Sequence, residues 1–151
     1  MCVGAGSVLI AMPILHEWNA PNGVLRTVLI GPVGFEEIYR HLDEVAEADA
    51  FPRAELIDAR ATEGPPPSFS ELRRLAARAR DLMGGAKPGP RAIVIDPSPI
   101  NRLAVELFCV FMSGPMNIDF FTSEAEARRW LCDRLHGAEH LERRDTDKLA
   151  V

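Results

Sequence analysis

The sequence predicts one α/β domain: a mixed, mostly parallel five-stranded sheet that opens with an antiparallel hairpin and carries four main helices. Three observations predict this class. The chain has 151 residues, 47% hydrophobic and 26% charged, which suits a single globular domain. Short apolar strand segments alternate with helical segments, so crossover connections and parallel pairing are expected. Asn22-Gly23, between the first two strand segments, is typical of a hairpin turn.

The hairpin and the first helix are predicted from residue type and spacing. The second hairpin strand is rich in β-branched residues, which favour extended backbone. In the first helix, Phe35, Ile38, Leu42 and Val45 recur every three or four residues, as on one helical face. The hairpin strands are predicted over residues 13–18 and 24–30, and the helix over 35–48.

Capping residues delimit the later helices. Ser68 and Glu71 have the spacing of a capping box, in which each side chain satisfies a backbone N–H of the first turn. Ser98 suits an N-cap and Pro99 a first helical position, and Ser123 is expected to open the last helix. The remaining strands are predicted over residues 55–59, 91–95 and 117–122, and the remaining helices over 69–83, 99–111 and 123–135.

The chain is predicted to contain three parts. Residues 1–12 form a peripheral extension, residues 13–136 the α/β domain, and residues 137–151 a polar C-terminal tail. The extension is apolar but lacks a preceding Lys or Arg, so it is a poor signal peptide. No uncharged apolar run reaches the roughly 18 residues of a membrane span, and a cytoplasmic location is expected.

The net charge restricts the expected partners, and the cysteine content indicates the expected compartment. The formal net charge is −5, which disfavours nucleic acid because phosphate neutralisation dominates that binding. Cys2, Cys109 and Cys132 form no CxxC pair, which indicates a reducing compartment. We expect Cys109 and Cys132 to be buried as small apolar residues.

No motif predicts a catalytic residue, a metal or another cofactor. His136, Glu139 and His140 match the H-x-x-E-H pattern of some zinc peptidases, but they lie in the polar tail without a convincing third ligand. We interpret the match as chance. His16 and His41 are expected to be structural, because neither has a Cys or Ser partner at motif spacing.

Polar residues gather where the predicted parallel strands end, which is where open α/β sheets bind ligands. The carboxyl ends of these strands and the helix starts that follow them are therefore the predicted binding surface. The candidate residues for a ligand or a partner are Asp58, Arg60, Ser68, Asp96, Ser98, Asn101 and Ser123.

Residues 13–135 resemble a divergent STAS-type domain, with the SpoIIAA-like fold, of the uncharacterised bacterial STAS-like branch. The resemblance rests on the opening hairpin ending in Gly31-Pro32-Val33, the strand end 56–60 (LIDAR), the strand 91–95 (RAIVI) and the closing segment 121–131. It implies a regulatory module whose serine, directly after the aspartate matched by Asp58, is phosphorylated. Here that position is Ala59, which has no hydroxyl, so the phosphoswitch is not expected.

Three functions stay open. The first is a non-catalytic binding or regulatory module that docks a protein partner or a small ligand at the strand-end loops. The second is a small enzyme that uses Asp58 or Asp96 as acid or base and Arg60 as an anion clamp. The third is a structural homo-oligomer subunit, such as a homodimer, whose N-terminal extension adds to a neighbour's sheet edge. The binding module is favoured because no catalytic constellation is visible.

Overall fold

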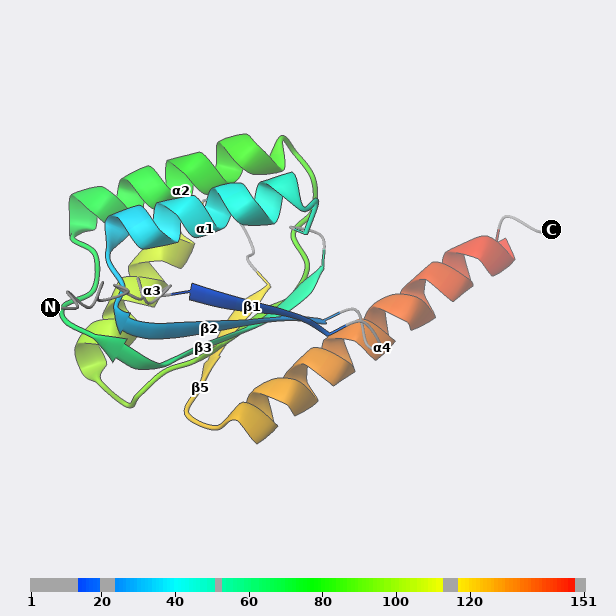
Figure 1. Cartoon of the computed structure of the whole chain (residues 1–151). Helices are drawn as coiled ribbons and strands as arrows, with labels where there is room; N and C mark the ends of the chain where they lie inside the picture. The colour runs from blue at the N-terminus through cyan, green and yellow to red at the C-terminus, as the bar shows by residue number, and fades with distance from the viewer. Residues whose placement is uncertain (1–13, 20–23, 51–52, 113–116, 149–151) are drawn as a thin grey trace, which may run out of the picture.

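The computed structural model describes residues 14–19, 24–50, 53–112 and 117–148. Strands and helices alternate after an initial hairpin (Figure 1). In chain order they are β1 (Ile14–Asn19), β2 (Val24–Pro32), α1 (Phe35–Glu47), β3 (Ala54–Glu63), α2 (Phe69–Met83), β4 (Arg91–Val94), α3 (Pro99–Phe111), β5 (Ile118–Phe121) and α4 (Glu124–Lys148).

The sheet has the order β1-β2-β3-β4-β5. β1 pairs antiparallel with β2, with His16 opposite Thr27, and the other neighbouring strands pair in parallel. The predicted fold class is therefore confirmed: a mixed, mostly parallel five-stranded sheet with an N-terminal hairpin and four helices. β3 is the central strand, and the side chains of its first half, from Ala54 to Asp58, are mostly buried, whereas Arg60, Ala61 and Glu63 are exposed.

Each face of the sheet has its own core. On one face, α1, α2 and α3 pack around a cluster that includes Leu25, Leu42 and Leu75. On the other face, α4 packs Ala127 and Leu131 against small and aliphatic side chains of β3 and β4. In Figure 1, α1 and α2 lie above the sheet and α4 lies below it. The pleat sends successive side chains of β3 alternately into these two layers.

Two of the predicted N-caps, Ser68 and Ser98, behave differently. Ser68 accepts a hydrogen bond from the Glu71 backbone N–H at 3.3 Å, and the Glu71 carboxylate accepts one from the Ser68 N–H at 2.7 Å. The capping box is thus confirmed, and α2 spans the predicted residues. α3 begins at Pro99 as predicted, but the Ser98 side chain makes no cap hydrogen bond. Only the Ser98 carbonyl takes part, accepting from the Arg102 N–H.

Two predicted element lengths were wrong. β3 continues to Glu63 instead of stopping at residue 59, because β2 also runs on and pairs with it through Pro32. A register irregularity between Val28 and Ile30 accommodates this extension. The last helix, predicted over residues 123–135, runs to Lys148. Gly137 costs a helix only about 1 kcal/mol relative to alanine, and the following Glu, Arg and Leu residues favour helix.

Two predictions concern residues that the structure does not describe. They are the N-terminal extension, residues 1–12, and the turn at Asn22-Gly23. Among the described residues, Cys109 is half-buried but Cys132 is exposed, so its predicted burial was wrong. No described helix is both long enough and apolar enough to cross a bilayer.

Candidate functional site

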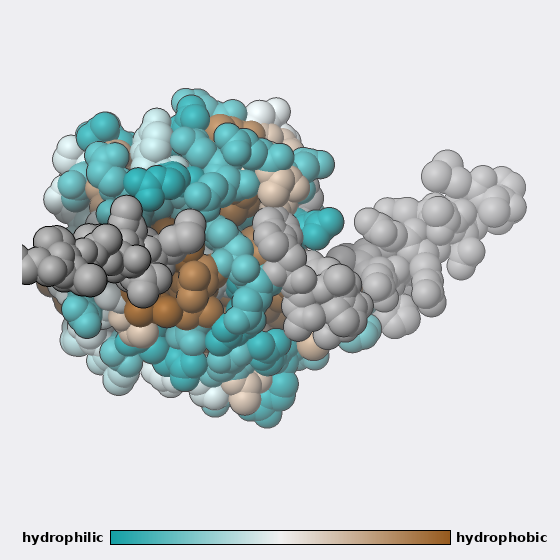
Figure 2. Space-filling model, viewed as in Figure 1, coloured by the Kyte–Doolittle hydropathy of each residue, from teal (hydrophilic) through white to brown (hydrophobic). Residues whose placement is uncertain are grey.

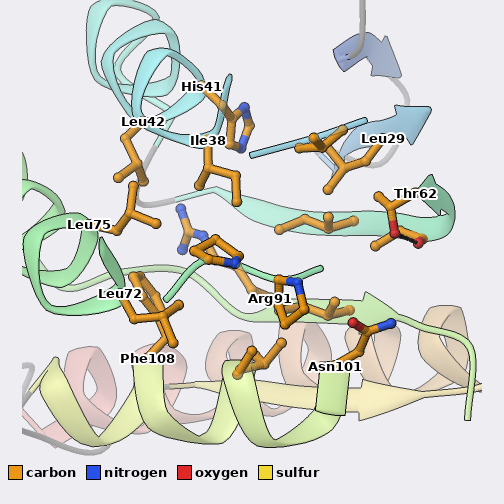
Figure 3. Close-up of a pocket in the computed structure, with 18 of the residues that line it drawn as sticks. Leu29, Ile38, His41, Leu42, Thr62, Leu72, Leu75, Arg91, Asn101 and Phe108 are labelled. Carbon is orange, nitrogen blue, oxygen red and sulfur yellow. Dashed lines mark hydrogen bonds between the residues drawn. The ribbon is translucent and has the colours of Figure 1, made fainter. Parts of the chain in front are cut away.

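A mostly apolar cavity of about 230 Å³ lies between the sheet and the helices α1, α2 and α3. Ile38 and Leu42 of α1, Leu72 of α2 and Phe108 of α3 surround it, with Leu29 on the sheet side (Figure 3). The loop after β3, residues 64–67, also contributes to the wall. The cavity therefore extends to the loops beyond the carboxyl ends of the strands. In Figure 2, hydrophobic side chains are exposed in the middle of the molecule, below α1.

The β3 pleat decides which side chains reach the cavity. Glu55, Ile57 and Ala59 face it, whereas Leu56 belongs to the core under α4. Asp58 is not part of the cavity wall but interacts with residues beside α4. The polar pair predicted at the end of β3, Asp58 and Arg60, therefore lies together on the α4 face of the sheet and not in the cavity.

A buried polar cluster forms one part of the cavity wall. The Glu55 carboxylate is 2% exposed and accepts a 2.7 Å hydrogen bond from the Thr27 hydroxyl. His41 Nε2 lies 3.2 Å from the same Glu55 oxygen, and Arg91 Nε lies 3.3 Å from the other. Arg91 also donates to the Gly89 carbonyl. A buried carboxylate is tolerable only with such partners, because burial otherwise removes its hydration.

The partners of Glu55 determine its ionisation. Burial alone would raise the pKa of Glu55, but the hydrogen bond and charge of His41, the Arg91 guanidinium and the Thr27 hydroxyl together lower it to about 2. Burial lowers the pKa of Arg91, against the opposing effect of Glu55. Glu55 and Arg91 therefore form a paired, charge-balanced unit, and this pair presents no net charge to the cavity.

A second ion network lies at the carboxyl ends of the strands, outside the cavity wall. The Arg60 guanidinium donates to both Asp58 oxygens, at 2.9 and 2.7 Å. Hydrogen bonds from Arg60 lower the pKa of Asp58 despite its burial, and Asp58 in turn raises the pKa of Arg60. Glu124, at the start of α4, accepts from both Arg26 and Arg60. This network ties α4 to β2 and β3.

The predicted candidate residues are not gathered at one point. Asp58 and Arg60 form a direct ion pair, and Asn101 lies in the cavity wall near Thr62 (Figure 3). Ser68 is exposed and occupied as a cap, and Asp96 is exposed. Ser98 and Ser123 are half-buried and precede α3 and α4. Of these seven residues, only Asn101 lies in the wall of the cavity.

The buried polar residues Thr27, His41, Glu55 and Arg91 were not among the predicted candidates. A signal was available in the sequence, because Glu55 and Arg91 stand at the first positions of two predicted strands whose other residues are mostly apolar. Charged residues are almost never fully buried unless they are paired. Two opposite charges in neighbouring buried strands therefore indicate a partnership, although the strand register that joins them is not visible in the sequence.

The first strand of the sheet is antiparallel and the others are parallel. Three helices, α1, α2 and α3, cover one face of the sheet and α4 covers the other. This arrangement defines an α/β domain with the SpoIIAA-like fold. Among solved structures, the chain is similar to an uncharacterised protein of the DUF3478 family from Shewanella loihica PV-4, which has a SpoIIAA-like fold. The two are 20% identical, with a TM-score of 0.51, over 79% of this chain and 92% of that one. The likeness confirms the fold predicted from the STAS-type resemblance. No protein-family model and no curated protein sequence matches the chain.

Proposed function

We propose that this protein is a binding module for a small, mostly apolar molecule, held in the cavity between the sheet and helices α1 to α3. The observation that carries this proposal is the 230 Å³ cavity with its predominantly aliphatic and aromatic wall. An apolar cavity of about 150 Å³ is known to hold benzene, so this one has room for a somewhat larger guest. Protein interiors otherwise leave few voids larger than a water molecule.

The polar groups of the wall favour an uncharged polar end on the ligand. Glu55 and Arg91 neutralise each other, so neither a free cation nor a free anion is matched by that pair. Toward the strand-end loops, the Asn101 amide can donate or accept, and the Thr62 hydroxyl, which donates its proton to the Ala59 carbonyl at 2.8 Å, can accept a hydrogen bond. An alkyl chain that carries a hydroxyl or an amide suits this arrangement.

A binding role is better supported than the acid–base alternative. Asp58 has a lowered pKa through its ion pair with Arg60, which suits a structural carboxylate rather than a proton donor. Neither Asp58 nor Asp96 belongs to the wall of the cavity. Docking of a protein partner at the strand-end loops is compatible with a ligand-filled cavity. One of these loops, residues 64–67, lines the cavity, so the same loop could contact both the ligand and a partner.

The test uses 1-octanol as a probe with the full chain. We expect saturable binding, seen as saturation-transfer signals in NMR and as a rise in the melting temperature. Ala104→Phe places a ring into the cavity from α3 and should weaken the binding by about tenfold or more, because the ring occupies the space of the ligand.

Val110→Phe is the matched control. It adds a similar bulk on the same helix at a position that is 69% exposed and outside the cavity, so octanol affinity should stay unchanged. Absence of binding by the unmodified protein, or equal affinity in Ala104→Phe, would contradict the cavity as the ligand site.

A further inference from the structure

Beside the cavity, two histidines and a glutamate converge from different elements. His16 comes from the edge strand β1, and His41 and Glu44 lie about one turn apart on α1. One possible ligand atom from each residue lies within 4.8 Å of the other two. We propose that His16, His41 and Glu44 form a binding site for a divalent first-row transition metal ion such as Zn²⁺.

The first independent observation concerns His41. This residue is 7% exposed, and its Nδ1 atom is buried without a hydrogen-bond partner. Its Nε2 lies 3.2 Å from the Glu55 carboxylate and hydrogen-bonds to it, so in the neutral ring, which is the form that binds a metal ion, the Nε2–H donates there and Nδ1 carries the lone pair. A carboxylate on the far ring nitrogen is the usual way in which proteins orient a metal-binding histidine. A buried acceptor without a partner is costly, and a metal ion would satisfy it.

The second observation concerns His16 and its tautomer. The Thr27 hydroxyl donates its proton to Glu55, so toward His16 Nδ1, 3.3 Å away, its oxygen acts as the acceptor. The Nδ1 atom of His16 therefore carries the proton, and in the neutral ring Nε2 is an acceptor. That Nε2 lies 2.9 Å from the Glu44 carboxylate. Two acceptors at this distance require a cation between them, which is either a proton or a metal ion.

The ligand set suggests the kind of ion. Two imidazoles and one carboxylate suit zinc and neighbouring transition metals rather than Mg²⁺ or Ca²⁺, which prefer oxygen. With bonds of about 2.05 Å, tetrahedral ligand atoms lie roughly 3.4 Å apart. The ring planes of His16 and His41 stack at 18° with their centroids 5.0 Å apart, so one ring must turn and the ligand atoms must move closer before both imidazoles bind one ion. The Glu44 side chain is 44% exposed and its carboxylate already lies 2.9 Å from His16 Nε2, and three protein ligands leave a fourth position for water.

This site does not depend on the ligand proposed for the cavity. His16 and Glu44 are not part of the cavity wall, and only His41 belongs to both. Filling the cavity by Ala104→Phe should therefore leave metal affinity unchanged. Failure of octanol binding and failure of zinc binding are separate results.

The experiment is isothermal titration of the chelator-treated full chain with ZnCl₂. We expect one ion per chain, with affinity reduced at least tenfold in Glu44→Gln and in His16→Asn. Glu47→Gln is the matched control, because it makes the same change at an exposed position on the same helix. Melting temperatures close to that of the native protein should show that Glu44→Gln and Glu47→Gln remain folded.

His136→Asn tests the competing H-x-x-E-H match in α4 and should bind zinc normally. A long-range ¹⁵N NMR spectrum should show zinc-dependent coordination shifts at His41 Nδ1 and His16 Nε2. The proposed site would be overturned if the native protein does not bind zinc, if Glu44→Gln binds as well as Glu47→Gln, or if His136→Asn is the variant that loses binding.

Discussion

At the scale of single residues, Glu55 is a buried carboxylate with three polar partners. It lies on the central strand, is 2% exposed, and is held by Thr27, His41 and Arg91 from three neighbouring elements. Removing one partner of a buried ion pair leaves the other charge uncompensated, which typically costs 3–5 kcal/mol. Removing both charges costs much less. This asymmetry predicts the order of stability among variants of Glu55 and Arg91.

Glu55→Gln should therefore lower the free energy of unfolding by about 3 kcal/mol or more at neutral pH, because it removes the carboxylate charge that is paired with the buried Arg91. The double variant Glu55→Gln/Arg91→Gln should be more stable than Glu55→Gln alone. Urea denaturation followed by circular dichroism measures both values. A double variant whose destabilisation equals the sum of the two single changes would contradict the pairing.

The pH dependence has a definite sign. The pKa of Glu55 is about 2 in the folded protein against an ordinary value of 4.5, so folding favours its ionised form. The resulting stabilisation is fully present above pH 4.5 and is lost as the pH falls toward about 2. Between pH 4.5 and about 2, the free energy of unfolding should fall less for the double variant than for the native protein, as measured by urea denaturation at a series of pH values. If the free energy of unfolding depends on pH in the same way for both proteins, the result would count against the low pKa of Glu55.

At the scale of elements, two serines with similar sequence contexts have different roles. Ser68 satisfies a backbone N–H of α2 through its side chain, whereas the Ser98 side chain makes no cap hydrogen bond to α3. Pro99, the first residue of α3, has no N–H to satisfy, which reduces the need for a side-chain cap. The contribution of each helix start to stability therefore differs.

Ser68→Ala should destabilise the protein by about 1 kcal/mol, the usual value of an N-cap hydrogen bond. Ser98→Ala, the matched change at the other helix, should alter the free energy of unfolding by less than about 0.5 kcal/mol. Chemical denaturation under identical conditions compares them. Equal effects of the two changes would contradict the difference in capping.

At the scale of the whole molecule, α4 closes the second face of the sheet with only its first part. Among the described side chains, Ala127, Trp130, Leu131 and Leu135 pack there. Glu124 anchors the helix start to Arg26 and Arg60. A helix of 25 residues is about 37 Å long, and its C-terminal half extends beyond the sheet in Figure 1. The packing contacts that the described side chains of α4 make with the sheet therefore come from its first three turns or so.

A chain ending after Gly137 should keep the free energy of unfolding of the full chain within about 0.5 kcal/mol. Leu131→Ala, which removes a side chain that is 2% exposed, should cost about 2–5 kcal/mol. Thermal and urea denaturation measure both. A large loss of stability on truncation would show that residues beyond Gly137 take part in the folded core.

Much of the fold was predictable because its determinants are local. The spacing of Phe35, Ile38, Leu42 and Val45 and the capping pair at α2 lie within single elements, and these predictions were confirmed. The ends of β3 and α4 were wrong because a competing factor decided each. Pairing with β2 extended β3, and helix propensity beyond Gly137 outweighed one glycine.

The order of strands and helices, the parallel character of the sheet and the SpoIIAA-like class could all be predicted from local sequence patterns, since periodicity and turn residues act over a few positions. Which polar groups meet depends instead on tertiary packing. Thr27, His41, Glu55 and Arg91 belong to four elements, and strand register and helix packing bring them together. The cavity and the convergence of His16 with Glu44 have the same origin, because they depend on how whole layers pack.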